Sequence, residues 1–129
     1  MPPGDGFTDA QRTRLAQAVV ATEQAIGLHV VLRVGRLDGG RAAAEAVLAA
    51  RGESAPASVV VAVDPTARAL EIVTGSRAAE VLDDRTCALA ALAMTSSFAA
   101  GDLVGGIRNG LQVLADHGRN LRTPHLSTF

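Results

Sequence analysis

Four aspartates in the second half of the chain have the side-chain type that metal chemistry needs: Asp64, Asp83, Asp84 and Asp102. A hard cation such as Ca²⁺ or Mg²⁺ requires several oxygen ligands that converge on one point. If residues 84–100 form one helix, its two ends lie about 25 Å apart, so Asp84 and Asp102 cannot share an ion. The pairs left open are Asp64 with Asp102, and Asp83 with Asp84.

Each of these carboxylates also has a structural interpretation. Asp83 or Asp84 would serve as the N-cap of the helix that follows, and Asp102 would cap the last helix. Asp64 precedes Pro65, a pair that is typical of turns. The metal interpretation and the structural interpretation both remain open at this point.

Three arginines are candidates for binding a phosphate or a carboxylate. Arg36 and Arg41 flank the loop that follows the first predicted strand, and Arg68 lies in a short turn after the second. In open α/β sheets, small ligands bind at the carboxyl ends of parallel strands. The sequence therefore predicts a pocket at that end of the sheet, near Asp64.

The remaining reactive side chains carry no recognisable catalytic pattern. His29, His117 and His125 lack the spacing of paired metal ligands on a helix. Cys87 is the single cysteine and lies on an apolar helical stripe, where a thiol is usually inert. No Gly-x-Ser-x-Gly motif and no phosphate-binding loop of the Gly-Lys-Ser/Thr type occurs.

The elements that would position these residues follow from the hydrophobic pattern. A capping box at Thr8 and Gln11 predicts a helix that ends at Gly27. Residues 28–34 alternate as a strand, and residues 41–51 form an Ala-rich helix. Residues 58–63 form a continuous apolar strand, and residues 69–74 return after a short turn. Together they predict a small mixed β-sheet of the α/β class, with a parallel pair and an antiparallel hairpin strand.

Two long helices follow a short helical piece at residues 76–82. Residues 84–100 are apolar nearly all round, so they are expected to form the most buried helix. A last helix runs to about His117 and directs Ile107, Leu111 and Leu114 inward. We expect a single domain over residues 8–117, a flexible N-terminus at 1–7 and a polar tail at 118–129.

Composition excludes several classes of partner. The 129 residues carry a net charge of −1, all 12 basic residues are arginine, and only 2% are aromatic, which speaks against nucleic-acid binding. No apolar run is long enough to span a membrane, so no membrane insertion is expected. The first residues show no signal peptide, and the expected location is cytoplasmic.

The order of these parts resembles the TPM domain, and within that family the short actinobacterial members without an assigned activity. The matching positions are Asp64, Thr74, Gly75, Asp84, Phe98, Asp102 and Gly105. The resemblance implies an α/β fold flanked by helices. Because family members have been described as acid phosphatases and as divalent-metal binders, it also implies those activities as alternatives.

Two functional hypotheses result. The first is a non-catalytic binding or accessory module with no certain cofactor. The alternative is a phosphatase that depends on Ca²⁺ or Mg²⁺ and uses the carboxylates named above. A protein partner or self-association, through the last helix and the tail ending in Phe129, is compatible with either.

Overall fold

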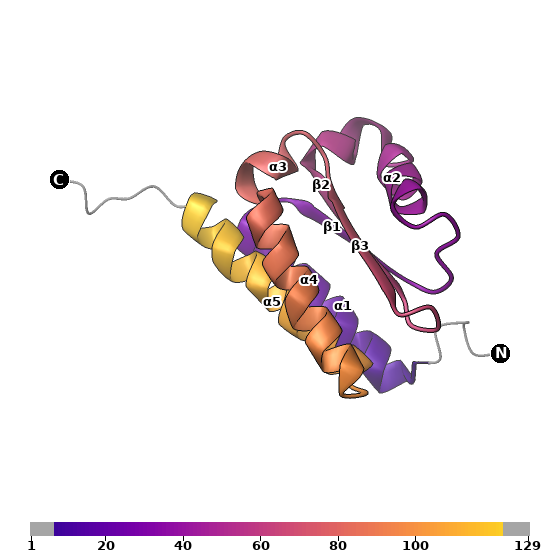
Figure 1. Cartoon of the computed structure of the whole chain (residues 1–129). Coiled ribbons are helices and arrows are strands. Elements are labelled where there is room, and N and C mark those ends of the chain that lie inside the picture. Colours follow the sequence, from indigo (N-terminus) through magenta and orange to yellow (C-terminus); the bar gives the residue numbers. More distant parts are fainter. Residues whose placement is uncertain (1–6, 123–129) are drawn as a thin grey trace.

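The computed structural model of the chain describes residues 7–122, and side chains up to residue 118. Figure 1 shows the order of the elements along the chain. They are α1 (Asp9–Ile26), β1 (His29–Val34), α2 (Arg41–Ala49), the 3₁₀ helix η1 (Gly52–Ala57), β2 (Ser58–Asp64), β3 (Ala69–Thr74), α3 (Ala78–Val81), α4 (Asp84–Ala99) and α5 (Leu103–Arg122).

The three strands form one sheet in the order β1-β2-β3. Strand β1 pairs with β2 in parallel, with His29 opposite Ser58, and β3 pairs with β2 in antiparallel fashion, with Asp64 opposite Ala69. The crossover between the parallel strands contains α2 and η1, whereas four turn residues join β2 to β3. The predicted small mixed sheet is thus confirmed.

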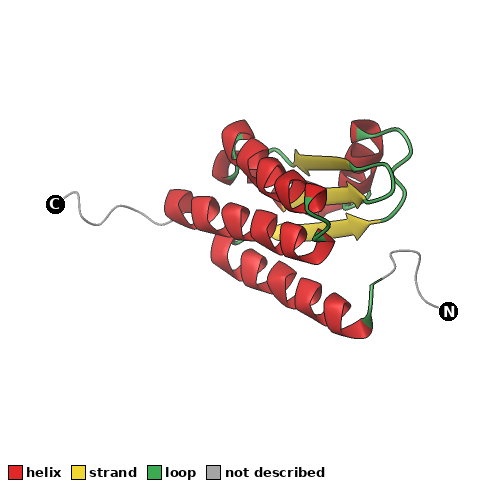
Figure 2. Cartoon of the chain, turned by 60° about the horizontal axis from the view of Figure 1, so that its bottom comes forward, coloured by secondary structure: helices red, strands yellow, loops and turns green. Residues whose placement is uncertain are grey.

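Helices cover both faces of this sheet unequally. Helices α1, α5 and α4 lie side by side on one face with α5 in the middle, and α2 lies on the other face (Figures 1 and 2). Alternation along β2 sends Val59, Val61 and Val63 to the three-helix side and Val60 and Ala62 to the α2 side. Both sets are buried, which explains the unbroken apolar run of this central strand.

Local signals explain where α1 begins and ends. The Thr8 hydroxyl accepts a hydrogen bond from the Gln11 amide at 3.1 Å, and the Gln11 side chain accepts one from the Thr8 amide at 2.9 Å. Gly27 ends the helix with a φ of 71°, a left-handed conformation that glycine adopts at little cost. The predicted capping box and glycine cap are therefore confirmed.

Helices α4 and α5 pack closely because two glycines of α5 face α4. A Cβ at Gly106 would come within 2.7 Å of the Phe98 ring, and a Cβ at Gly110 would overlap the side chain of Met94. Met94 is fully buried in this contact. The glycines thus set the distance between the two helices.

Three expectations from the sequence need correction. Helix α4 is not the most buried helix, because it lies at the side of the helix layer and Leu92 is 62% exposed; α5 occupies the middle. Phe7 belongs to the core rather than to a flexible terminus. The last helix continues to Arg122, so the first residues of the expected polar tail are helical.

Candidate functional site

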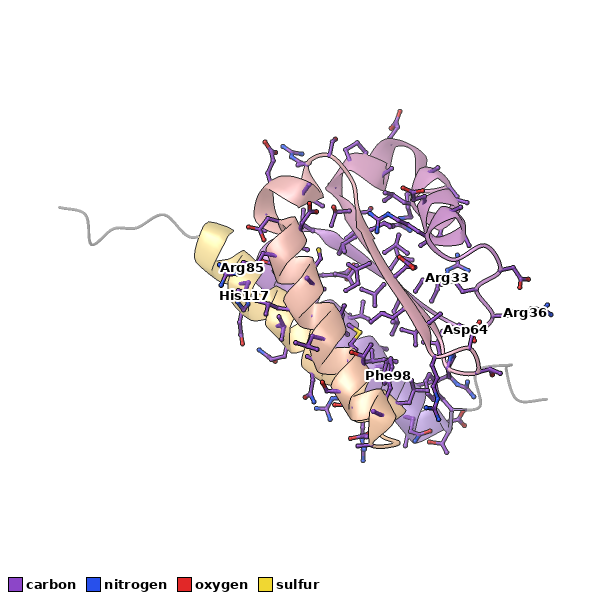
Figure 3. The ribbon with its side chains drawn as sticks, in the orientation of Figure 1. Arg33, Arg36, Asp64, Arg85, Phe98 and His117 are labelled. Carbon is purple, nitrogen blue, oxygen red and sulfur yellow. The ribbon has the colours of Figure 1, made fainter. Side chains whose placement is uncertain are left out.

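A pocket of about 670 Å³ lies at the carboxyl ends of β1 and β2, where the sequence predicts one. Two segments line it: residues 35–39, which follow β1, and residues 64–67, which begin with the last residue of β2. Parallel strands end at the same edge of a sheet, so the two connections meet there. Figure 3 shows Asp64 and Arg36 at this edge.

Asp64 holds the two walls of this pocket together. Its Oδ2 accepts a hydrogen bond from the Leu37 amide at 3.0 Å, and its Oδ1 accepts one from the Ala67 amide at 3.1 Å. Only 7% of the residue is exposed. The Ala67 and Leu37 amides lower the pKa of the Asp64 carboxyl below its ordinary value of 3.8, because they stabilise the charged form. Both carboxylate oxygens thus have structural partners.

The three predicted arginines do not converge on the pocket. Arg36 lines it, but its Nε donates to Asp38 Oδ1 at 2.9 Å, and both side chains are largely exposed. Arg41 lies between two glutamates: its Nε is 3.8 Å from Glu45 Oε2, and its Nη1 is 3.7 Å from Glu71 Oε1. Arg68 lies exposed in the turn after β2, with a φ of 54°, outside the pocket lining. Because Asp38 and Asp64 accompany Arg36, the lining has no excess of positive charge.

The other predicted metal ligands lie at helix N-termini. Asp83 caps α4 through its Oδ1, which accepts from the Thr86 amide at 2.9 Å, and the amide and hydroxyl of Thr86 lower the pKa of the Asp83 carboxyl. Asp102 accepts from the Gly105 amide at 2.9 Å, and Asp84 is exposed in the first turn of α4. Over residues 7–122, no three Asp, Glu, His or Cys residues are close enough together to hold a metal ion.

Cys87 and the described histidines also have unreactive surroundings. Burial, together with the nearby charges of Asp84 and Asp83, raises the pKa of the Cys87 thiol to about 11, so the thiol is protonated at neutral pH. His117 bonds to the Val113 carbonyl oxygen at 2.9 Å, and His29 is exposed at the start of β1. His125 and Phe129 lie outside the described residues.

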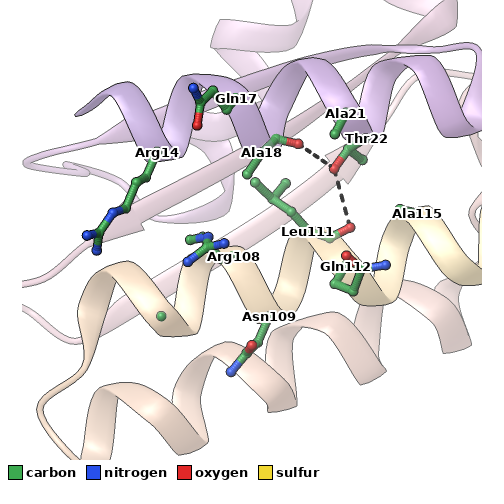
Figure 4. Close-up of a pocket in the computed structure, with 11 residues that line it drawn as sticks. Arg14, Gln17, Ala18, Ala21, Thr22, Arg108, Asn109, Leu111, Gln112 and Ala115 are labelled. Carbon is green, nitrogen blue, oxygen red and sulfur yellow. Dashed lines mark hydrogen bonds between the residues drawn. The ribbon is translucent and has the colours of Figure 1, made fainter. Parts of the chain in front are cut away.

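A second hollow, the α1–α5 groove, has an excess of positive charge in its lining, which the carboxyl-end pocket lacks. It measures about 440 Å³ and carries two arginines and three amide side chains on a floor of small and apolar residues (Figure 4). Its lining residues are Arg14, Gln17, Ala18, Ala21, Thr22, Gly105, Arg108, Asn109, Leu111, Gln112 and Ala115.

The charge in the α1–α5 groove is of one sign. Arg14 and Arg108 both line it, from α1 and α5, and no acidic residue does. Neither arginine forms an ion pair with any residue in the described range 7–122. Two exposed guanidinium groups therefore remain available for carboxylate or phosphate oxygens, which they bind in a bidentate manner.

Buried contacts fix the floor of this groove. The Thr22 hydroxyl, on a residue only 2% exposed, donates to the Ala18 carbonyl oxygen at 2.8 Å and lies 3.5 Å from that of Leu111. Figure 4 shows both contacts, the first within α1 and the second between α1 and α5. On the rim, Gln112 donates to Asp116 at 2.8 Å and Asn109 donates to Ser97 at 3.4 Å. Thr22 and Asn109 thus contact a neighbouring helix, whereas Gln112 is held within α5.

Sequence reasoning missed this groove because its two halves are far apart in the chain. Arg14, Gln17, Ala18 and Ala21 recur at helical spacing on α1, and Arg108, Gln112 and Ala115 do so on α5. Each set forms a stripe of polar and small residues beside the apolar stripe of its helix. These stripes were a signal that the sequence offered, but only the packing of α1 against α5 joins them into one groove.

The fold and these sites define a small α/β domain with a mixed sheet and two polar hollows. The chain belongs to a family described as a domain of unknown function (DUF5130), whose pattern matches residues 2–115. A comparison with curated proteins gives no match. The family therefore has no assigned activity that could be carried over.

Two solved structures share the fold. The N-terminal domain of the cg2496 protein from Corynebacterium glutamicum, solved by NMR, is 14% identical with a TM-score of 0.74, over 93% of this chain and 78% of that one. The BA42 protein from the psychrophilic bacterium Bizionia argentinensis, also solved by NMR, is 12% identical with a TM-score of 0.79, over 93% and 86%. At these identities the likeness establishes the fold alone.

No described helix has both the length and the apolar character that crossing a membrane requires.

Proposed function

We propose that this chain is a non-catalytic binding module that holds an acidic peptide segment in the α1–α5 groove. The observation that carries the proposal is the pair Arg14 and Arg108, which line one hollow without an acidic neighbour in its lining. The lining itself offers an entering carboxylate two positive charges and neutral hydrogen-bonding groups, while Asp116 and Asp102 lie beside the lining and already accept hydrogen bonds from Gln112 and the Gly105 amide. The carboxylate would therefore be attracted rather than repelled.

The other lining residues favour a peptide over an isolated anion. Amide side chains at Gln17, Asn109 and Gln112 can donate to or accept from peptide groups. Ala18, Ala21 and Ala115 have small side chains, so the main chain of a peptide can approach the helices closely. The volume of about 440 Å³ is sufficient for a few residues, within the usual range for ligand pockets.

The non-catalytic part of the proposal rests on the side chains that catalysis would need. Asp64, Asp83 and Asp102 already accept hydrogen bonds from backbone amides. Cys87 carries a thiol whose pKa is raised to about 11. Each of these groups thus has a structural partner or is in its unreactive form.

Fluorescence anisotropy with a labelled Glu-rich peptide tests this function. We expect Arg14→Gln and Arg108→Gln each to weaken binding several-fold, and the double variant to weaken it at least tenfold, since exposed charge pairs contribute roughly 0.2–1 kcal/mol and better-ordered ones more. Arg51→Gln is the matched control, because Arg51 is exposed in the turn after α2, on the other side of the sheet. The same peptide with Gln in place of Glu should not bind.

Two outcomes of the peptide titrations would refute the proposal. One is equal binding of the Glu and Gln peptides, which would remove the role of charge. The other is an Arg51→Gln effect as large as that of the groove variants, which would show non-specific attraction. Inorganic phosphate is included as a competitor, because displacement by phosphate at low millimolar concentration would indicate a small-anion site instead of a peptide site.

The resemblance to the TPM domain and the metal-dependent phosphatase alternative stay predictions. So do the candidate metal ligands Asp64, Asp83, Asp84 and Asp102 and the candidate anion ligands Arg36, Arg41 and Arg68. A phosphatase assay with Ca²⁺ or Mg²⁺ on Asp64→Asn and Asp84→Asn tests the alternative. Unchanged turnover in both variants would count against it.

A further inference from the structure

Strand β3 forms one edge of the sheet, because the strand order is β1-β2-β3. Gly75 follows β3, and its amide donates to the Ser58 carbonyl oxygen of β2 at 2.9 Å. In an antiparallel ladder, every second residue turns its main-chain groups away from the paired strand. The N–H and C=O groups of Leu70, Ile72 and Thr74 therefore point outward from the sheet, and we call them the β3 edge.

The β3 edge has no hydrogen-bond partner within residues 7–122. Figure 1 shows β3 between α4 and α2, with no further strand beside it. The strand also lacks the features that usually protect a free edge from other chains. It contains no proline or lysine, it pairs residue by residue with β2 without a bulge, and its charged side chain, Glu71, lies 3.7 Å from Arg41.

The opposite edge of the sheet, on β1, is blocked. The Gly35 amide donates to the Val63 carbonyl oxygen at 2.9 Å, so Val30 and every second residue after it turn their main-chain groups outward. Glu23 of α1 takes the first of these groups, because its Oε2 accepts from the Val30 amide at 2.9 Å. A strand that paired with β1 would have to displace this carboxylate. The sheet thus has one blocked edge and one open edge.

We propose that the β3 edge pairs with the β3 edge of a second copy of this chain, antiparallel about a two-fold axis at Ile72. In this register Ile72 lies opposite its own copy, and Leu70 lies opposite Thr74 of the other copy. Every outward N–H and C=O group then gains a partner, with two hydrogen bonds for each facing pair. Because both copies use the same edge and the β1 edge is blocked, the assembly closes as a dimer and does not extend into a fibre.

The neighbouring registers are less favourable. An axis at Glu71 would place two carboxylates directly opposite each other, which destabilises a strand pair. An axis at Val73 would place Leu70 opposite a residue beyond the end of the other β3. With the axis at Ile72, Glu71 lies opposite Val73 and keeps Arg41 of its own copy as its neighbour.

The surroundings of the β3 edge allow a second copy to approach. Helix α4 flanks β3, and residues 86–101 contain no charged residue, so the helices bring no like charges together near the axis. Arg68 and Arg77, beyond the two ends of the strand, are exposed to solvent, which screens their charges. A contact made mainly by one strand from each copy is small, below about 1,200 Å². We therefore expect a reversible dimer with a micromolar dissociation constant.

Sedimentation velocity of the full chain from low to high micromolar concentration tests the dimer. Thr74→Pro removes an outward donor that has no partner in the single chain, and edge strands tolerate proline at such positions. We expect the unmodified chain to dimerise and Thr74→Pro to raise the dissociation constant at least tenfold.

Val34→Pro is the matched control for Thr74→Pro. Val34 is likewise the last residue of an edge strand, with an outward amide and a following glycine that bonds to β2. We expect this variant to dimerise like the unmodified chain. The proposal is overturned by a chain that stays monomeric, by a Thr74→Pro variant that keeps the dimer, or by a Val34→Pro variant that loses it. Circular dichroism checks each fold, and Thr74→Lys and Val34→Lys replace the proline variants if these unfold.

Cysteine cross-linking tests the register. In a Cys87→Ser background, Leu70→Cys and Thr74→Cys chains are prepared separately. Across the axis, these two positions have Cα atoms about 5.5 Å apart, within reach of a disulfide. Two copies of the same variant would be separated by about 14 Å. A mixture of the two variants should therefore form disulfide-linked dimers under mild oxidation, and neither variant should do so alone. Equal cross-linking of a single variant and of the mixture would refute the antiparallel register.

Discussion

The packing of α5 against α4 predicts that Gly110→Ala destabilises the protein. Alanine in place of glycine inside a helix normally stabilises it by about 1 kcal/mol. Here the added Cβ would overlap Cγ and Cε of Met94 and come within 2.9 Å of its Sδ. Met94 is fully buried, so its side chain can move only by displacing its neighbours in the core. Overpacking of this kind costs about 1–3 kcal/mol, so we expect a net loss of about 1 kcal/mol.

The sign of this effect should reverse when Met94 is truncated. Met94→Ala alone should cost about 2–5 kcal/mol, because it leaves a cavity between α4 and α5. With the methionine gone, Gly110→Ala no longer meets an obstacle and should stabilise the variant by about 1 kcal/mol. The difference between the two backgrounds, roughly 2 kcal/mol, is the coupling between these residues.

Urea unfolding followed by far-ultraviolet circular dichroism measures all four forms of this cycle. The chain has no Trp or Tyr, so fluorescence gives no intrinsic signal. A stabilising osmolyte in every sample keeps the weaker variants folded. Ala88→Gly, at an exposed position of α4, calibrates the helix propensity term. If Gly110→Ala stabilises the protein with Met94 present, or has the same effect in both backgrounds, Met94 does not obstruct a side chain at position 110.

Two predictions concern titratable groups. Because amides lower the folded-state pKa of Asp64 below 3.8, its contribution to stability is present above pH 3.8 and is lost as the pH falls through the lower folded value. Asp64→Asn should therefore flatten the acid side of a pH–stability curve, and an unchanged curve would count against the role of Asp64 in joining the two loops. Because burial raises the pKa of Cys87 to about 11, we expect iodoacetamide to alkylate it at pH 8 far more slowly than glutathione. Equal rates would show that the thiol is accessible and ionised.

The carboxyl-end pocket shows how far sequence reasoning reached toward a site. Two parallel strands require their carboxyl ends to meet, so a pocket at the connections after β1 and β2 was predictable. It was not predictable which side chains line this pocket. Arg36 lines the pocket, whereas Arg41 lies between Glu45 and Glu71 and Arg68 lies outside.

Helix α4 shows the opposite case. Its uncharged sequence indicated a buried helix, because the exposed face of a surface helix normally carries charged and polar side chains. The structure places α5 in the middle of the layer and leaves Leu89 and Leu92 on the surface. A hydrophobic pattern indicates that exposure of a helix face to water is unfavourable. It does not indicate whether another part of the same chain covers that face.

The sequence by itself determined the elements and their pairing in this protein. The Thr8 capping box, the apolar run of β2 and the Asp64–Pro65 turn are local signals, because each depends on a few neighbouring residues. Only the tertiary structure decided which distant surfaces meet. Arg14 and Arg108 are separated by most of the chain and share the α1–α5 groove only because α1 packs beside α5. That neighbourhood depends on how the three helices share one face of the sheet, a choice made by the packing of whole helices and not by any local pattern.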